Sequence, residues 1–275
     1  MARVGSNSLS FPEFRGATRR IVLANLAAYF LLVIISLIFR NRFGDIKDSL
    51  SFIPSYFLHG ALWQPITYSL VHSPGAIIGT ALELLSLWFL AGFLETMGHR
   101  PSWVMGLFVT AILATAASAL ALYGIMAALR FSPEFTPITG TFGAIFAMLA
   151  VIGIRYGEME FMLFPLPIGI KAKYMAIIVT LIAVAFLFTS EGVYSFAKLG
   201  GGLGGLLWMG RAPNRGVSFD ISEKWYGLRN RYYRWKRRRA ARKFEVYMKS
   251  QGRTVKFDGN GNKIDDDPND KKRWN

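Results

Sequence analysis

GTFGAIFA, residues 140–147, and AKLGGGLGG, residues 197–205, place small residues four positions apart inside apolar runs. Residues four apart lie on one face of a helix, so each pair offers a flat stripe to a neighbour. In a bilayer, small residues that let two backbones approach supply much of the packing between helices. The two segments therefore predict a membrane bundle in which the helices that contain them touch. The residues predicted to pack are Gly140, Gly143, Ala147, Gly200, Gly201, Gly204 and Gly205.

Charge and apolar residues are separated along the chain. Of its 275 residues, 52% are hydrophobic, yet the net charge is +15. The long apolar runs lie between residues 21 and 210, whereas most of the charged residues come later. A soluble domain balances these properties around one core, so the pattern predicts a membrane domain followed by a basic tail. The absence of cysteine excludes disulfides and thiolate chemistry.

Six apolar runs are candidates for membrane-spanning helices, each of which needs about 20 residues to cross the hydrocarbon core. They cover residues 21–39, 76–93, 103–129, 140–154, 174–189 and 193–209. The fourth and sixth runs are short, so a count of five spans is the alternative. Because short spans are tolerated among surrounding helices, we predict an all-α membrane protein with six transmembrane helices.

The distribution of basic residues predicts the orientation of these spans. With the N-terminus inside, the inner segments before the tail hold eight Lys and Arg residues, against four in the outer loops. An excess of positive charge marks the cytoplasmic side, so both termini are expected in the cytoplasm. The predicted organisation is a cytoplasmic N-terminal segment, a membrane domain, a basic juxtamembrane helix, and a small hairpin with a disordered tail. Their ranges are 1–20, 21–211, 212–250 and 251–275.

Short motifs follow one another between residues 20 and 211. They are WQPITY at 63–68 with His72, LWF at 87–89, LE at 94–95, GTFGAIF at 140–146, PIGIKAKY at 167–174 and GGGLGG at 200–205. In this order they resemble the rhomboid family of intramembrane serine proteases. The resemblance implies a six-helix rhomboid-like bundle, with residues 40–75 forming a partly embedded loop between the first two spans.

The same resemblance implies that the chemical positions have been lost. Phe142 stands where the family carries its serine nucleophile, and Lys198 stands where it carries its histidine base. Gly79 and Glu83 stand at the positions near the oxyanion. A serine hydrolase needs a hydroxyl, a base within reach and donors for the oxyanion. Thr141 is no substitute, because neighbouring residues point about 100° apart on a helix.

The altered positions can be interpreted as parts of a structural cavity. A lysine inside a span costs about 2.5–3.5 kcal/mol on insertion scales, so Lys198 is expected to face the bundle or water. Glu83 is the acid inside a predicted span. We expect the two side chains to form an ion pair, the alternative being that each faces water independently. Phe142 is expected to fill the space that the lost site leaves.

These features predict a catalytically degenerate pseudoprotease rather than an enzyme. The resemblance implies that it binds transmembrane segments of client proteins without cleaving them. One alternative is an active rhomboid-type intramembrane serine endopeptidase with an unrecognised nucleophile, and another is a structural subunit of a membrane complex. No cofactor is predicted. His59, His72 and His99 are too dispersed to predict a metal site.

The tail interleaves basic and aromatic residues over 222–250. Such a segment next to a span is typical of an interfacial helix on anionic lipid. Nucleic acid or the ribosome is the alternative partner, because phosphate backbones attract the same side chains. Further on, DGNGN at 258–262 predicts a hairpin turn but lacks the glycine and glutamate of a calcium loop. The residues expected to bind lipid are Arg234, Lys236, Arg237, Arg238, Arg239 and Arg242.

Overall fold

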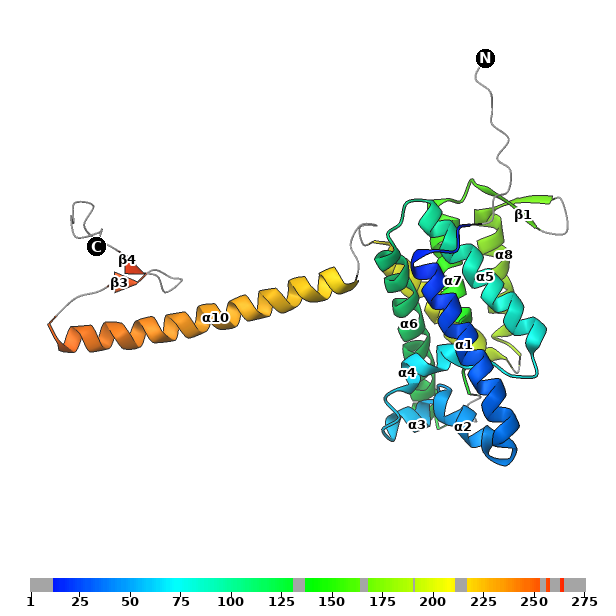
Figure 1. The fold of residues 1–275 in the computed structure, drawn as a ribbon, viewed down its shortest axis with the longest axis horizontal. Coiled ribbons are helices and arrows are strands. Elements are labelled where there is room, and N and C mark those ends of the chain that lie inside the picture. The colour runs from blue at the N-terminus through cyan, green and yellow to red at the C-terminus, as the bar shows by residue number, and fades with distance from the viewer. Residues whose placement is uncertain are drawn as a thin grey trace, which may run out of the picture. The chain divides into compact units, whose positions relative to one another are not determined.

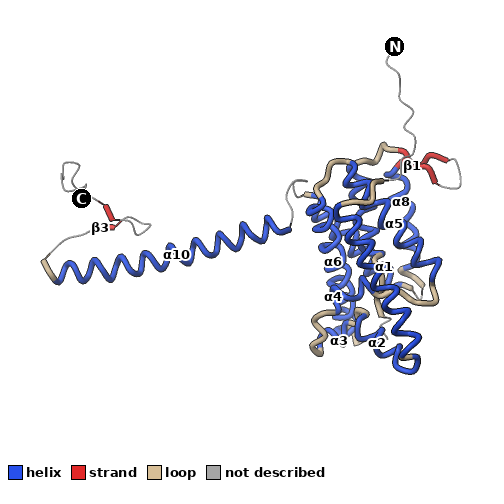
Figure 2. The backbone as a smooth tube through the Cα atoms, in the orientation of Figure 1, coloured by secondary structure: helices blue, strands red, loops and turns tan. Residues whose placement is uncertain are grey.

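The computed structural model describes residues 12–130, 137–163, 168–189, 191–210, 217–252, 256–257 and 263–264. The chain divides into two compact units, Met1–Val217 and Ser218–Asn275. Figure 1 shows the helices of the first unit side by side, and Figure 2 shows that helix dominates the described chain. The prediction of a mostly helical protein is confirmed.

Apolar helices build the first unit where the sequence predicts them, with boundaries that differ by a few residues. Those of the described chain are α1 (Gly16–Ile38), α5 (Ile77–Thr96), α6 (Pro101–Ala128), α7 (Phe142–Arg155), α8 (Ala172–Phe186) and α9 (Gly192–Met209). In the described part of the chain, α1, α5 and α6 are long and apolar enough to cross a membrane, and α7 and α8 are shorter apolar helices.

The segment between α1 and α5 folds into short helical turns. Gln64 is fully buried there, and its Oε1 accepts a hydrogen bond from the Ile53 N–H at 3.2 Å. The Tyr68 hydroxyl donates to the Ile112 carbonyl of α6 at 2.8 Å. Buried polar side chains therefore attach the segment to the bundle. Its elements are η1 (Arg40–Arg42), α2 (Phe43–Leu50), α3 (Pro54–Leu58), α4 (Gln64–Thr67) and η2 (Tyr68–Leu70).

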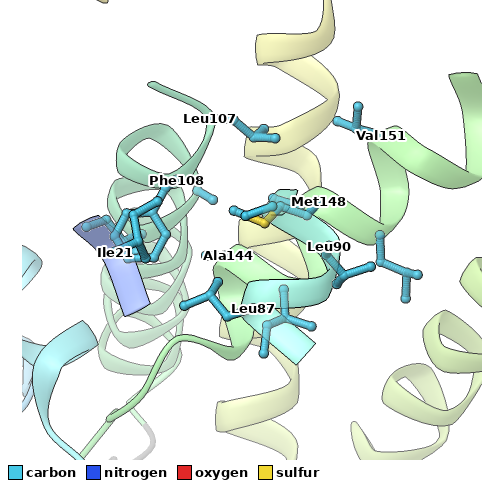
Figure 3. Close-up of a cluster of buried hydrophobic side chains, with 14 of the residues drawn as sticks. Ile21, Leu87, Leu90, Leu107, Phe108, Ala144, Met148 and Val151 are labelled. Atoms are coloured by element: carbon cyan, nitrogen blue, oxygen red, sulfur yellow. The ribbon is translucent and has the colours of Figure 1, made fainter. Parts of the chain in front are cut away.

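The core lies where α5, α6, α7 and α9 meet. Figure 3 shows side chains from different helices converging there, among them Leu87 and Leu90 of α5, Leu107 of α6 and Met148 of α7. Leu87, Leu107 and Met148 have no exposed surface. Because α7 and α9 are enclosed by these contacts, much of each helix faces protein rather than solvent or lipid.

Two glycine stripes let α9 approach both α6 and α7. A Cβ atom at Gly201 would lie 2.6 Å from the Gly143 carbonyl oxygen, and one at Gly205 would lie 2.7 Å from the Ala147 Cα. These two glycines meet α7, as the stripe pattern predicts. The other stripe differs from the prediction: Gly200 and Gly204 face Ser118 and Ala114 of α6 instead. Consecutive glycines point to different faces, so one helix can serve two neighbours.

A hairpin that the sequence analysis did not predict precedes α8. Strand β1 (Glu160–Leu163) pairs antiparallel with β2 (Ile168–Lys171), with Glu160 opposite Lys171. The second unit contains α10 (Val217–Ser250) and the pair β3 (Lys256–Phe257) and β4 (Lys263–Ile264), which lies where a hairpin is predicted. The disordered end predicted from residue 265 falls outside the described residues.

Candidate functional site

Glu83 of α5 caps the start of α7. Its Oε1 accepts a hydrogen bond from the Thr141 N–H and another from the Thr141 hydroxyl, the latter at 2.7 Å. Thr141 is the N-cap residue of α7 and is fully buried, and Glu83 is only 6% exposed. The first N–H groups of a helix lack acceptors within the helix, and its N-terminus attracts negative charge. The Glu83 carboxylate of α5 therefore caps α7, a task that a side chain at the start of the capped helix usually performs.

Gly140 makes this cap possible. Its φ is +81°, a conformation that residues with a Cβ rarely adopt, and a Cβ there would lie 2.7 Å from Glu83 Oε1. Gly140 was predicted to pack one helix against another. Instead it lies just before α7 and contacts a carboxylate, so its role is to admit Glu83.

His72 completes the buried cluster. It is 3% exposed, with Nδ1 3.2 Å from the Leu70 carbonyl oxygen and Nε2 3.6 Å from Glu83 Oε2. A carbonyl oxygen only accepts, so Nδ1 carries the proton in this contact. The edge that carries Nε2 then faces a carboxylate oxygen, and Nε2 makes no hydrogen bond among the described residues.

The predicted ion pair between Lys198 and Glu83 is not formed. Among the described residues, the basic side chain within ion-pair distance of Glu83 is His72, and Lys198 Nζ lies over two rings instead. It is 4.0 Å from the ring centre of Tyr194 and 5.1 Å from that of Phe142. Side chains on a helix point back toward its N-terminus, and this direction takes Lys198 to Tyr194, one turn earlier.

Two further positions differ from expectation. Phe142 does not fill a closed space: its ring lies edge-on to Tyr194 at 6.4 Å and is 36% exposed. Gly79 is exposed, and a Cβ there would meet only the Ala76 Cβ at 3.9 Å. The structure therefore brings Phe142, Lys198 and Glu83 to one end of the bundle and leaves Gly79 out of their contacts.

The chemistry open to this cluster is narrow. The Thr141 hydroxyl is buried and donates to a carboxylate, and the Tyr194 hydroxyl donates to the Thr139 carbonyl at 2.8 Å. A nucleophile must reach both its base and its substrate. Over the described ranges, no three His, Cys, Asp or Glu side chains gather in a way that could hold a metal ion. The arrangement is suited to holding helices and presenting the Lys198 charge.

A second carboxylate cap, which the sequence pattern did not predict, lies at the opposite end of α5. Glu95 Oε1 accepts hydrogen bonds from the Ala17 N–H at 2.7 Å and the Thr18 N–H at 3.2 Å, at the start of α1. Gly16 has φ +61°, and a Cβ there would lie 2.5 Å from Glu95 Oε2. The sequence signal for this cap was a glycine just before one apolar run, together with an acid in another apolar run.

An aromatic cluster lies just beyond Glu95. The His99 ring stacks on Trp103 with ring centres 4.0 Å apart, and its Nε2 lies 3.0 Å from the Tyr156 hydroxyl. Burial lowers the pKa of His99 from 6.5 to about 4, and the charge of Arg155 lowers it as well. His99 is therefore neutral in the folded protein at physiological pH.

The described basic side chains of α10 are open to solvent. Arg239 stacks its guanidinium over Trp235 at 5.5 Å, and Arg231, Arg234, Trp235 and Arg238 line an open pocket of about 350 Å³. The predicted lipid-binding residues are all exposed: Arg234, Lys236, Arg237, Arg238, Arg239 and Arg242.

Comparison with known families overturns the predicted resemblance. The model of a eukaryotic integral membrane protein family, DUF1751, matches residues 24–209. This is not a rhomboid protease family, so the identification with rhomboids is wrong. The motifs misled because stripes of small residues suit the packing of any membrane bundle. None of the curated proteins matches the sequence. The chain belongs to the DUF1751 family of eukaryotic integral membrane proteins.

Proposed function

We propose that this protein binds transmembrane segments of other membrane proteins and does not cleave them. The observation that carries the proposal is the exposure of Phe142. Most of α7 is buried, yet this ring is 36% exposed at its start. Both α5 and α8 pack against α7. An apolar ring accessible at the edge of a bundle suits contact with an apolar helix of another protein.

The surrounding helices offer matching surface. At the same end, Ile78 and Leu82 of α5 are 78% and 58% exposed, and Phe186 of α8 is 46% exposed. Only Ala172 and Ala183 of α8 are buried. Helices in lipid associate through packing rather than hydrophobic drive, so a client helix would be held by shape at this surface.

The hydrogen bonds of the polar cluster favour a non-catalytic role. Thr141 is the hydroxyl residue nearest to the start of α7, and its oxygen is buried and already donates to Glu83. Proteolysis through Thr141 would require breaking the cap of α7 and exposing the hydroxyl. Binding requires neither change.

We place six spans in the bilayer with both termini cytoplasmic. The shorter helices α7 and α9 pack on α6, and α8 packs on α7 and α9, which would allow all three to cross in a locally thinned bilayer. The excess of basic residues on the N-terminal side of the bundle supports the orientation. Cysteine-accessibility mapping in this cysteine-free chain would decide it, with single cysteines in the 40–75 segment and at the chain ends labelled from opposite sides.

The client proposal is tested by site-specific photocrosslinking. A photoreactive residue at position 142 should give discrete adducts with other membrane proteins in native membranes. The same residue at position 154 is the matched control, because Ile154 is on the same helix and is 61% exposed at its other end. Adducts of equal yield and identity at both positions would show that crosslinking reflects random contact in the membrane, and would contradict the proposal.

We also propose that α10 lies on anionic lipid. Its exposed basic residues and interleaved rings support this, at about 1 kcal/mol per basic residue near the surface. A spin label at position 238 of the full chain should become immobile in nanodiscs with phosphatidylserine and stay mobile in neutral ones. Equal mobility in both, with immobilisation on added RNA, would favour the nucleic-acid alternative instead.

A further inference from the structure

We propose that Lys198, Tyr194 and Phe142 form a binding site for the phosphate of a phospholipid headgroup. This site is distinct from the basic tail and goes beyond client binding. It stands whether or not position 142 crosslinks to other proteins.

The ammonium group of Lys198 has no ion-pair partner among the described residues, although the carboxylates of Glu191 and Glu83 lie near enough to act on it electrostatically. Within the part of the chain that the structure describes, Lys198 Nζ contacts two ring faces and makes no ion pair or hydrogen bond. Glu83 is engaged by Thr141 and His72, and Glu191, at the N-cap of α9, is beyond ion-pair distance. Lys198 is half-buried, so water reaches only part of it. A partly desolvated cation is stabilised by a bound anion.

The Lys198 ammonium lies close to the start of α9. Lys198 points back to Tyr194, which is two residues after the start of α9 at Gly192. With a rise of about 1.5 Å per residue, the ammonium lies within one turn of the helix end. Lysine side chains near helix ends reach toward the headgroups, and tyrosine is enriched at that level. The anions most abundant there are lipid phosphates.

The rings of Tyr194 and Phe142 cover only part of the Lys198 ammonium. The Tyr194 ring is held by its hydrogen bond to Thr139 and covers one side of the ammonium. Phe142 lies edge-on to it, and its exposed surface is apolar. A phosphate could approach the uncovered side of Nζ while an acyl chain follows the exposed apolar side chains. Lysine binds phosphate as a point charge, which requires no fixed fork geometry.

The test uses the full-length protein, purified and stripped of lipid, with thermal unfolding and native mass spectrometry as readouts. The added probes are phosphatidylglycerol, a diacylglycerol without phosphate, and inorganic phosphate. We expect phosphatidylglycerol alone to raise Tm and to appear as a bound adduct. Because α10 is also proposed to bind anionic lipid, the variants below are needed to assign the adduct to Lys198.

Variants then assign the site. Lys198→Met should weaken phosphatidylglycerol binding about tenfold, and Lys198→Arg should retain it. Lys47→Met is the matched control, because it removes the same charge from α2 at the same end of the bundle. Three results would overturn the site: unchanged binding in Lys198→Met, equal loss in Lys47→Met, or full stabilisation by inorganic phosphate or diacylglycerol.

Discussion

The two glutamates of α5 perform the same task at opposite ends of one helix. Glu83 caps α7 and Glu95 caps α1, each by accepting backbone N–H groups of another helix. Each faces a glycine with positive φ, Gly140 at +81° and Gly16 at +61°. The polar group at the start of α7 is therefore one of a structural pair, and catalysis is not needed to explain it.

The surroundings of the two caps differ. Glu83 is 6% exposed, also binds the Thr141 hydroxyl and faces His72, with Lys198 nearby on α9. Glu95 is partly exposed, and its Oε2 has no hydrogen-bond partner in the described structure. Capping therefore needs only the carboxylate and the glycine. What Glu83 adds, and what calls for a functional explanation, is its histidine and the lysine beside it.

The strongest test of the comparison removes each carboxylate. Glu83→Ala should lower the free energy of unfolding by about 3–5 kcal/mol, because Thr141 and His72 lose their buried partner. Glu95→Ala should cost about 1–2 kcal/mol, which is typical of a lost helix cap. Reversible unfolding in mixed micelles measures both. Equal losses would mean that the two caps do not differ in energy.

The glycines give the next largest difference. Gly140→Ala should cost about 2–4 kcal/mol, since it adds backbone strain and forces a buried carboxylate to move. At Gly16 the closest atoms are the end of a half-exposed Glu95 side chain, which can shift. Gly16→Ala should therefore cost only about 1–2 kcal/mol. Part of each loss comes from the clash between the new methyl group and the glutamate. Adding Glu83→Ala to Gly140→Ala, or Glu95→Ala to Gly16→Ala, should remove that part, and a cycle of single and double variants would measure it.

Acid should destabilise the Glu95 end of α5 through His99. The pKa of His99 is lowered from 6.5 to about 4, so the unfolded chain binds more protons than the folded one between these values. Stability should be full above pH 6.5 and fall by about 3 kcal/mol as pH drops to 4. His99→Phe keeps a ring for stacking on Trp103 and should remove this slope. An unchanged slope in that variant would assign the acid sensitivity to other groups.

The smallest and cleanest comparison exchanges one hydroxyl for a methyl group at each cap. Thr141→Val should cost about 1 kcal/mol, because the hydroxyl donates to Glu83. The Thr18 hydroxyl is buried beside the Glu95 cap and has no hydrogen-bond partner among the described residues, so Thr18→Val should be neutral or slightly stabilising. If both variants lose the same stability, the Thr141 hydroxyl bond is not a distinguishing feature of the Glu83 cap.

The helices and the small-residue stripes could be predicted because both depend on local pattern. Apolar runs gave the helix positions, and the spacing of Gly201 and Gly205 gave their face toward α7. The β1–β2 hairpin could not be predicted, because the sequence around residues 160–171 has no clear alternation and contains two prolines. Its strands are short and depend on their position between α7 and α8.

The partners of Glu83 could not be predicted from charge alone. In sequence, Lys198 was the opposite charge in a neighbouring span, so an ion pair was the simplest expectation. The structure places the start of α7 against α5, where backbone N–H groups compete for the same carboxylate. Which partner a carboxylate finds depends on the relative shift of two helices along their axes, and a single sequence does not specify that shift. Gly16 and Gly140 were the overlooked clues.

The glycine stripes of α9 also bear on how the chain is made. This helix is the last apolar helix described, and its glycines and Lys198 leave it outside the group of helices apolar enough to cross alone. Until it is synthesised, the small-residue faces of α6 and α7 have no partner. We expect α9 to insert only between the small-residue faces of α6 and α7. A ribosome-bound chain that ends before residue 192 should therefore be incompletely folded. Limited proteolysis of such chains, with and without residues 192–209, would show whether the last helix closes the fold.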